Sequence, residues 1–225
     1  MDNHRGSRRR RRRARGVDLD RIMMKRALDL ARSAAAIGEV PVGAVVHRDG
    51  EIIAEAGNTR EHDGDPVGHA ELLALQMAGR VLGRWRLTDC TLVVTLEPCA
   101  MCAGALVNAR IGRLVWGADD PKAGGCRSLY EIPADPRLNH RPLMVGGVHA
   151  AVSASLLRSF FHARRRKKKS CCFALIWERS WLGFPRIGLW LWGEWSRRAT
   201  GLIWRETIKP DTWTARASFR PWPVD

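Results

Sequence analysis

A strand of β-branched residues that leads into a proline and two cysteines constrains this 225-residue chain more than any other feature. The segment TLVVTLEPCAMC covers residues 91–102. Its first six residues have the composition of a buried strand, and Pro98 stands where a following helix can begin. Cys99 and Cys102 would then lie at i and i+3 on one helix face, where both sulfur atoms can reach one ion. The two thiols are therefore either core packing or half of a metal site.

The rest of residues 17–169 alternates between helical and strand patterns. Apolar spacings of three and four predict a helix from Asp18 to Gly38, and VGAVVHRDGEIIAEAG predicts a hairpin that turns at Asp49-Gly50. Further helices are predicted over residues 69–83, 99–110 and roughly 150–166, and further strands over 113–117 and 143–148, with a long loop over 118–142. This order predicts an α/β domain with a mixed five-stranded sheet and helices on both faces.

The formal charge of +15 is confined to the two ends of the chain. Residues 1–16 hold eight Lys/Arg against one acidic residue, residues 164–225 hold fourteen against five, and the stretch between them holds sixteen against seventeen. The arginine run over residues 8–13 predicts a disordered arm over 1–16. Residues 170–225 hold eight of the ten tryptophans without a steady period. We interpret them as a Trp/Arg-rich tail that is not a folded domain, and the alternative is an interfacial segment for a membrane surface or nucleic acid.

The cysteine usage favours a metal over disulfides. The chain has six cysteines, and its first sixteen residues contain no apolar core of a signal peptide. No apolar run approaches the roughly 20 residues that span a bilayer. These features predict a cytoplasmic, reducing location, where cysteine spacing indicates metal binding before disulfide formation.

His69, in the segment GHAEL, is the candidate for the other half of the metal site. One imidazole and two thiolates suit zinc, with a fourth position left for water. His69 and Glu71 are at i and i+2, so both can approach one centre only in the first turn of a helix. Both helices are therefore expected to direct their N-termini at the metal, where their dipoles stabilise Cys99 and Cys102 as thiolates. The alternative is a structural site closed by a fourth ligand, for which Cys126 is the best candidate.

Glu71 would have a different role from the three ligands. Hydrolysis at an amidine-like ring carbon needs a group that takes a proton from the attacking water and returns it to the departing amine. An unligated carboxylate beside the water can do both. The combination of H-x-E with a later P-C-x-x-C is the signature of zinc-dependent nucleobase deaminases.

On these motifs, residues 20–166 resemble the bacterial tRNA-specific adenosine deaminases of the cytidine-deaminase-like superfamily, which convert the wobble adenosine of a tRNA anticodon to inosine. The matching stretches are EVPVGAVV (39–46), GNTR (57–60), HAELLAL (69–75), residues 91–125, LNHRP (138–142) and LLRSFFHARRR (156–166). The resemblance implies a three-layer α/β/α fold, a homodimer and one zinc ion per subunit. It implies His69, Cys99 and Cys102 as ligands and Glu71 as the proton carrier.

The resemblance also implies a set of residues that bind the flipped base or the anticodon stem-loop. They are Asn58, Asp120, Lys122, Asn139, Phe161 and Arg165. Loop nucleotides are read by extrusion, stacking and phosphate contacts, which an aromatic and basic helix end can supply. Without the resemblance, Asn58 equally fits a turn after the hairpin and Phe161 equally fits a helix core. Arg127 departs from the family, which has a small residue there, and a cation at this position would alter the loop or add a phosphate contact.

Two other functions remain open. A deaminase of the same fold can act on free guanine or cytosine with the same chemistry at a different ring carbon. A nucleic-acid-binding protein without catalysis would use the basic ends and keep the deaminase core as a scaffold. The complete set of His69, Glu71, Cys99 and Cys102 favours the enzyme.

Overall fold

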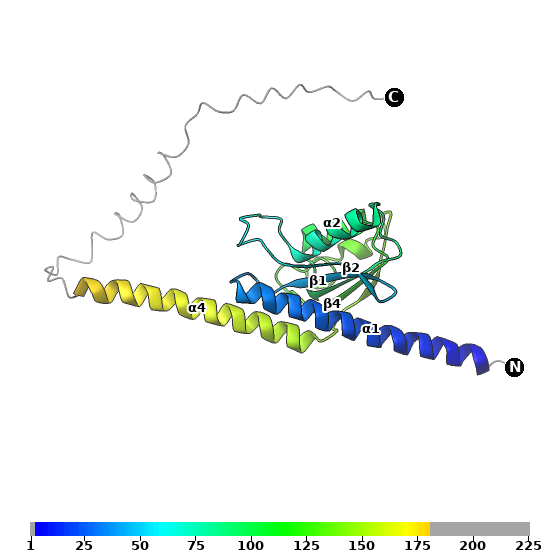
Figure 1. The fold of residues 1–225 in the computed structure, drawn as a ribbon, viewed down its shortest axis with the longest axis horizontal. Helices are drawn as coiled ribbons and strands as arrows, with labels where there is room; N and C mark the ends of the chain where they lie inside the picture. Colours follow the sequence, from blue (N-terminus) through cyan, green and yellow to red (C-terminus); the bar gives the residue numbers. More distant parts are fainter. Residues whose placement is uncertain (1–2, 181–225) are drawn as a thin grey trace, which may run out of the picture. The chain divides into compact units, whose positions relative to one another are not determined.

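The computed structural model describes the backbone of residues 3–180 and the side chains of residues 16–166. Helices and strands alternate after an initial hairpin, as the sequence predicts (Figure 1). In chain order the elements are α1 (Asn3–Ala36), β1 (Gly43–Arg48), β2 (Glu51–Gly57), α2 (Ala70–Leu82), β3 (Thr91–Leu96), α3 (Ala100–Asn108), β4 (Arg113–Ala118), a 3-10 turn η1 (Ile132–Ala134), β5 (Leu143–Val145) and α4 (Ala150–Ser180).

The five strands form one mixed sheet in the order β2-β1-β3-β4-β5. β1 pairs antiparallel with β2 and β3, whereas β3, β4 and β5 are parallel. The β1–β2 hairpin turns at Asp49 and Gly50, whose φ angles of 51° and 97° are the left-handed values of a tight turn. Because β3 and β4 are parallel, the residues that follow them lie at the same edge of the sheet.

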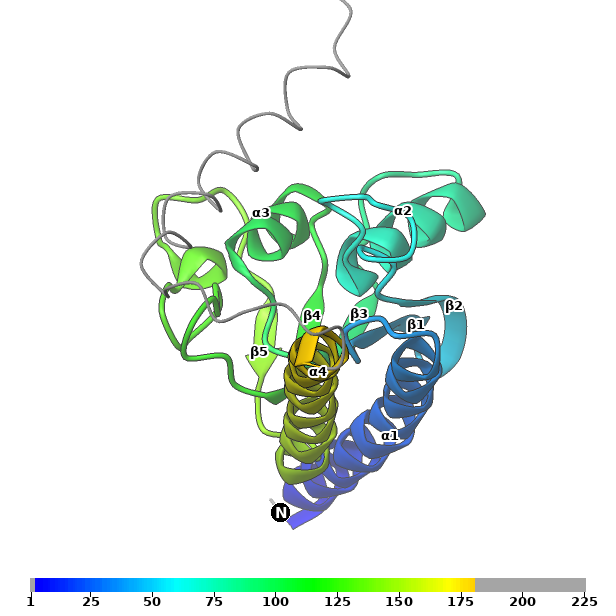
Figure 2. The same cartoon turned by 90° about the vertical axis from the view of Figure 1, so that its left-hand side faces the viewer.

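Two helices cover each face of the sheet, which confirms the three-layer α/β/α fold (Figure 2). Ala74 of α2 and Leu106 of α3 are buried in one core cluster with β1, β3 and β4. Met24 of α1 is buried in a second cluster on the opposite face, against which Leu156 of α4 packs. A Cβ on Gly43 would lie 2.1 Å from the carbonyl oxygen of Ala27, so the backbone of α1 rests directly on β1.

The ends of several elements differ from the prediction. α1 begins at Asn3, before the predicted start at Asp18, and α4 continues past the basic run to Ser180. Arginine and lysine are good helix formers and extending an existing helix needs no new nucleus, so apolar periodicity alone ends these helices too early. β5 stops at Val145, before Gly147 with its φ of 90°. The η1 turn interrupts the predicted long loop.

The chain divides into two compact units, Met1–Ser170 and Cys171–Asp225. In the second unit, the structure describes only the end of α4, up to Ser180. The Trp/Arg-rich tail was predicted over residues 170–225, and its residues 181–225 lie outside the described part of the chain. Among the helices of residues 3–180, none is both long enough and apolar enough to cross a membrane.

Candidate metal centre and active site

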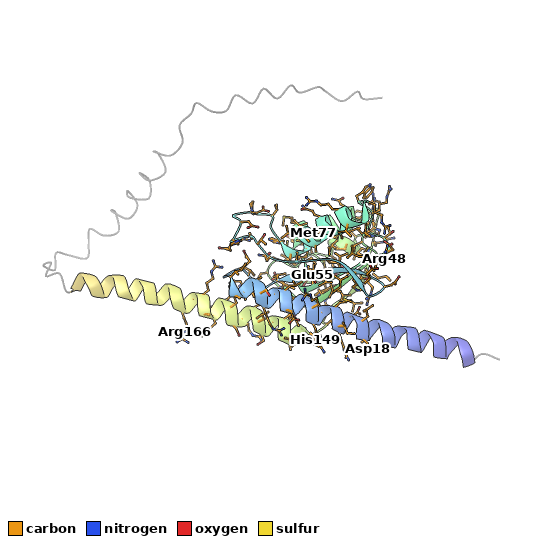
Figure 3. All side chains as sticks on the ribbon, in the orientation of Figure 1. Asp18, Arg48, Glu55, Met77, His149 and Arg166 are labelled. Atoms are coloured by element: carbon orange, nitrogen blue, oxygen red, sulfur yellow. The ribbon has the colours of Figure 1, made fainter. Side chains whose placement is uncertain are left out.

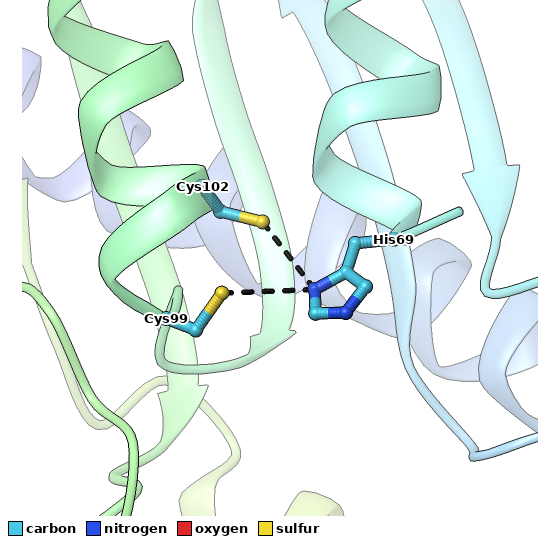
Figure 4. A group of neighbouring side chains, drawn as sticks. All are labelled: His69, Cys99 and Cys102. Atoms are coloured by element: carbon cyan, nitrogen blue, oxygen red, sulfur yellow. Dashed lines mark hydrogen bonds between the residues drawn. The ribbon is translucent and has the colours of Figure 1, made fainter. Parts of the chain in front are cut away.

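His69 and Cys99 occupy the N-cap positions of α2 and α3. Both residues have extended backbone angles, and neither side chain makes a capping hydrogen bond within its helix. Cys102 lies one turn into α3, on the same face as Cys99. The side chains of all three point toward one another from the two helix N-termini, as expected (Figure 4).

The distances within this cluster fit a tetrahedral zinc ion. Nδ1 of His69 lies 3.7 Å from Sγ of Cys99 and 3.5 Å from Sγ of Cys102. With Zn–S of about 2.3 Å and Zn–N of about 2.0 Å, tetrahedral geometry separates a sulfur from a nitrogen ligand by about 3.5 Å. Over the described residues, this is the one group of three or more His, Cys, Asp or Glu side chains close enough to hold a metal ion. The donor set therefore fits zinc with a fourth position open.

Cys126 does not join the cluster. Its side chain is buried in the loop after β4, and its Sγ lies 4.0 Å from the carbonyl oxygen of Pro98. Burial raises the pKa of this thiol to about 12, which keeps it protonated and disfavours metal binding. The geometry therefore supports a site with three protein ligands over a closed structural site.

The cluster itself perturbs the pKa values of its members. A hydrogen bond from the Cys102 thiol, with help from His69, lowers the pKa of Cys99 to about 4. The same hydrogen bond to Cys99, together with burial, raises the pKa of the Cys102 thiol. The hydrogen bond to Cys99 raises the pKa of His69. The three donors thus hold protons between them, which a bound metal would displace.

Glu71 lies in the first turn of α2, two residues after His69, and only 4% of its surface is exposed. Burial raises the pKa of this carboxyl group to about 6, although the nearby His69 acts in the opposite direction. A carboxyl group with a pKa close to neutrality can both accept and donate a proton. Its position beside the ligands and its pKa suit the predicted role as proton carrier.

Asn58, the next predicted residue, directly follows β2 and is buried rather than part of an exposed turn. Its Nδ2 donates a hydrogen bond of 2.8 Å to Oε1 of Glu39, which is itself 1% exposed. The same carboxylate accepts hydrogen bonds from the backbone N–H groups of Val40, Glu61 and His62. Burial acts to raise the pKa of Glu39, but these hydrogen bonds outweigh it and lower the pKa. Glu39 therefore fixes both the amide of Asn58 and the loop that leads to His69.

Asp120 and Lys122 lie in the loop after β4, at the same edge of the sheet as Cys99. The backbone N–H of Asp120 donates to Oε2 of Glu97, the residue two positions before Cys99. Oδ1 of Asp120 accepts from the N–H of Lys122 at 3.0 Å, and the Lys122 side chain is exposed. The structure thus brings these two predicted residues next to the metal cluster.

Asn139 lies elsewhere. Oδ1 of Asn139 accepts a hydrogen bond from the guanidinium of Arg110, a residue between α3 and β4. His140 beside it contacts the carbonyl oxygen of Ile111 at 2.7 Å. These contacts place Asn139 at the edge of the sheet where β3 and β4 begin, whereas Cys99 follows the end of β3. Within one chain, the structure does not bring Asn139 together with the metal cluster.

Phe161 and Arg165 lie on α4 and are exposed. Their neighbour Arg164 donates a hydrogen bond of 2.9 Å to Oε2 of Glu61, in the loop that Glu39 holds. Since this loop leads to His69, the part of α4 around Arg164 lies beside the approach to the cluster. Phe161 packs edge-on against Phe160, with ring centroids 5.4 Å apart, and is 40% exposed, so it is not a core residue.

Arg127 does not offer a free cation. Its guanidinium donates to both carboxylate oxygens of Asp119, at 2.6 and 2.7 Å, and lies 5.1 Å from the ring centroid of Trp116. Trp116 donates a hydrogen bond of 2.9 Å from Nε1 to Oδ1 of the same aspartate. In this structure the cation at position 127 is used in contacts within the loop.

The sequence analysis missed two residues that shape the site, Glu39 and Glu97. Each is an acidic residue that is at most 2% exposed, and each accepts hydrogen bonds from the backbone of a loop beside the cluster. A signal was present in the sequence, because each carboxylate stands beside a proline segment and an apolar strand, in GEVPV and TLEPC. Buried acids at such positions need several hydrogen-bond donors.

Comparison with known proteins identifies the family. A model of the MafB19-like deaminases matches residues 18–165. The tRNA-specific adenosine deaminase of Bacillus subtilis (strain 168) is 45% identical over 146 residues, which cover 65% of this chain and 91% of that protein. A solved structure from studies of A-to-I editing by tRNA:A34 deaminases at the wobble position of transfer RNA is 44% identical with a TM-score of 0.58, and the match covers 60% of this chain and 98% of that one.

A more distant structure is similar in fold alone. The guanine deaminase from Nitrosomonas europaea is 24% identical with a TM-score of 0.55, over 62% of this chain and 83% of that one. The identity with the tRNA-specific enzymes is almost twice as high over a similar length. The resemblance inferred from the motifs is thereby confirmed, and the chain belongs to the family of tRNA-specific adenosine deaminases.

Proposed function

We propose that the protein hydrolyses adenosine to inosine at the wobble position of a tRNA anticodon, with zinc as its cofactor. The observation that carries this proposal is the cluster of His69, Cys99 and Cys102 at two helix N-termini beside the buried Glu71. Family membership supports the substrate, because the relatives with 44–45% identity are named for adenosine in tRNA.

His69, Cys99 and Cys102 would hold the zinc ion, which when bound activates a water molecule for attack. Glu71 takes the proton of that water and returns it to the amine that leaves C6 of the base. Its burial keeps bulk water away and holds the pKa of its carboxyl group near neutrality. Asn58, held by Glu39, orients the base, which must leave the anticodon stack before it can enter the site.

The RNA around the reactive base would contact the loop after β4 and residues 161–165 of α4. Lys122 and Arg165 are exposed cations for phosphate groups, and Phe161 is an exposed ring for stacking. Asp120 is a further polar residue of the loop that could contact the RNA. Asn139 lies at the other edge of the sheet, so its contact would fall on RNA away from the reactive base.

The test is inosine formation in an anticodon stem-loop with adenosine at the wobble position. The full chain with one zinc per chain should produce inosine. Glu71→Ala should keep the zinc and the RNA affinity but lower turnover by at least about 100-fold, because it removes the proton carrier. Glu55→Ala is a matched control, since Glu55 on β2 (Figure 3) is a partly exposed acidic residue in an ion pair with Arg26 of α1. Turnover of free guanine or cytosine without any of the stem-loop would refute the proposal, as would full activity in Glu71→Ala.

We also propose that the enzyme is a homodimer that associates through α2 and α3. The outer surface of these helices has an apolar groove of about 780 Å³, lined by residues that include Leu72, Leu75, Trp85 and Ala105. Trp85 is 57% exposed, and Met77 on α2 is 43% exposed (Figure 3). Light scattering should give twice the chain mass, and Trp85→Glu should shift it to the monomer.

Residues 17–169 are proposed to contain the complete deaminase domain, with 1–16 and 170–225 as appendages. The family match to residues 18–165 supports these limits. Removal of residues 170–225 should leave inosine formation intact. The substrate also supports a cytoplasmic location, where tRNA is processed.

A further inference from the structure

The carboxylate of Glu97 is the centre of the loop that follows β4. Only 2% of Glu97 is exposed, and it accepts five hydrogen bonds from residues 120–128. Oε1 accepts from the backbone N–H groups of Cys126, Arg127 and Ser128, at 3.2, 2.7 and 2.8 Å. Oε2 accepts from the N–H of Asp120 at 3.0 Å and from the hydroxyl of Ser128. The four backbone N–H groups can only donate, so a carboxylate, with two acceptor oxygens, satisfies all of them at once.

Two glycines bring the loop into contact with both Glu97 and the backbone of the metal ligand. A Cβ on Gly124 would lie 2.5 Å from Cδ of Glu97, and a Cβ on Gly125 would lie 2.9 Å from Cα of Ala100. The N–H of Gly125 donates to the carbonyl oxygen of Pro98 at 2.7 Å, and Gly124 forms an isolated bridge with Cys99. The loop is thus built directly on the segment that carries the first cysteine ligand.

On its outer side, the same loop is closed by the ion pair of Arg127 with Asp119, described above. Asp119 and Arg127, eight residues apart, flank residues 120–126 of the loop. The backbone N–H of Arg127 donates to Glu97 on the inside, while its side chain binds Asp119 on the outside. The loop is therefore held from both sides, with Asp120 and Lys122 between its ends.

We propose that Glu97 is a positioning residue, which fixes the loop carrying Asp120 and Lys122 relative to Cys99 and so sets the affinity for the substrate. This inference rests on the proposed function for its substrate. The hydrogen bonds of the Glu97 carboxylate all go to residues of this loop, and none goes to a ligand side chain or to Glu71. The effect of Glu97 is on binding, through the shape of the loop.

Glu97→Gln is the sharpest variant, because it keeps the size of the side chain. The amide nitrogen replaces one oxygen and can no longer accept a hydrogen bond. If it stands in place of Oε2, the hydroxyl of Ser128 can turn and accept, so only the N–H of Asp120 loses its partner. If it stands in place of Oε1, three backbone N–H groups lose theirs. Even in the first orientation, the N–H of Asp120 loses its hydrogen bond to residue 97, and the loop is no longer held at Asp120.

Limited proteolysis of the full, zinc-loaded chain with trypsin reads out this release without any substrate. Lys122 and Arg127 are both trypsin sites within the loop. Cleavage after these two residues, mapped by mass spectrometry, should become at least about tenfold faster in Glu97→Gln, because local opening controls cleavage. The zinc content should stay at one per chain.

Asp20→Asn is the matched control for the loss of a buried carboxylate. Asp20 is 3% exposed and accepts two hydrogen bonds from Arg113, at the opposite edge of the sheet. It should leave cleavage after Lys122 and Arg127 unchanged. An equal rise in both variants, or none in Glu97→Gln, overturns the proposal. Gly124→Ala displaces the loop from Glu97 without changing a charge, and should reproduce the faster cleavage even if Glu97→Gln folds poorly.

Kinetics on the stem-loop separate this proposal from the proposed function. In Glu97→Gln, KM should rise at least about tenfold while kcat changes less than about threefold, because the reacting groups are untouched. A fall in kcat with an unchanged KM would overturn the positioning role. If the unaltered chain makes no inosine, the proposed function fails, and the proteolysis and the zinc content still decide whether Glu97 positions the loop.

Discussion

The buried carboxylate of Glu39 offers the prediction whose magnitude follows most directly from the structure. Its Oε1 accepts from the N–H of Val40 and from Nδ2 of Asn58, both at 2.8 Å. Its Oε2 accepts from the N–H groups of Glu61 and His62, at 2.6 and 3.1 Å. In Glu39→Gln, the amide nitrogen must face one of these two pairs of donors, so two hydrogen bonds to a charged group are lost in either orientation.

Each hydrogen bond to a charged group contributes about 1.5–3 kcal/mol. The N–H groups of Glu61 and His62 lie in an exposed loop, so water can replace the carboxylate as their acceptor and recover part of the lost free energy. We therefore expect Glu39→Gln to lower the free energy of unfolding by about 2–3 kcal/mol. Urea unfolding at neutral pH measures this change. Glu55→Gln is the control, since its ion pair with Arg26 is largely exposed and such pairs contribute little to stability.

The same variant should also lower deamination of the stem-loop, because Asn58 loses the partner that holds its amide. A loss of stability no larger than that of Glu55→Gln would refute the reasoning, because the hydrogen bonds would then not depend on the negative charge. Unchanged deamination in a clearly destabilised Glu39→Gln would show that the orientation of Asn58 does not depend on Glu39.

Three further predictions follow from the geometry. His69→Ala should lower the zinc content, measured by atomic emission, from one per chain to below about 0.1, whereas Cys126→Ser should leave it at one, since this thiol lies outside the cluster. Arg127→Gly should weaken stem-loop binding less than about threefold in a filter assay, because the guanidinium is already paired; Arg165→Ala, which removes an exposed cation, should weaken it more and reduce the salt dependence. Glu97 has a pKa below its usual 4.5 because hydrogen bonds from Ser128 and the loop outweigh burial, so its contribution to stability is present above pH 4.5 and is lost as the pH falls through the lowered value. Urea unfolding between pH 7 and pH 3.5 should therefore show a smaller loss of stability in Glu97→Gln than in the unaltered chain.

The sequence by itself determined the elements and the chemistry of the cluster. The Asp49-Gly50 turn, the strand over residues 91–96 and the helices after His69 and Pro98 follow from local patterns, because turn geometry and apolar periodicity act between residues close in the chain. The spacing of Cys99 and Cys102 fixed their common helix face. The i, i+2 spacing of His69 and Glu71 predicted that both stand at the start of a helix, and the structure places His69 at the N-cap of α2 and Glu71 in its first turn.

Only the tertiary structure decided how the loops around the cluster are held. The donors to Glu39 come from up to 23 residues away and those to Glu97 from 23 to 31 residues away, so no local pattern records them. The position of Asn139 at the far edge of the sheet depends on the path of residues 118–142, which have little periodicity. Likewise, nothing local in the sequence indicates that Arg127 pairs with Asp119, eight residues away, on the outer side of the loop. Contacts of this kind form only when the chain closes long loops, and that closure is specified by the packing of the whole domain rather than by neighbouring residues.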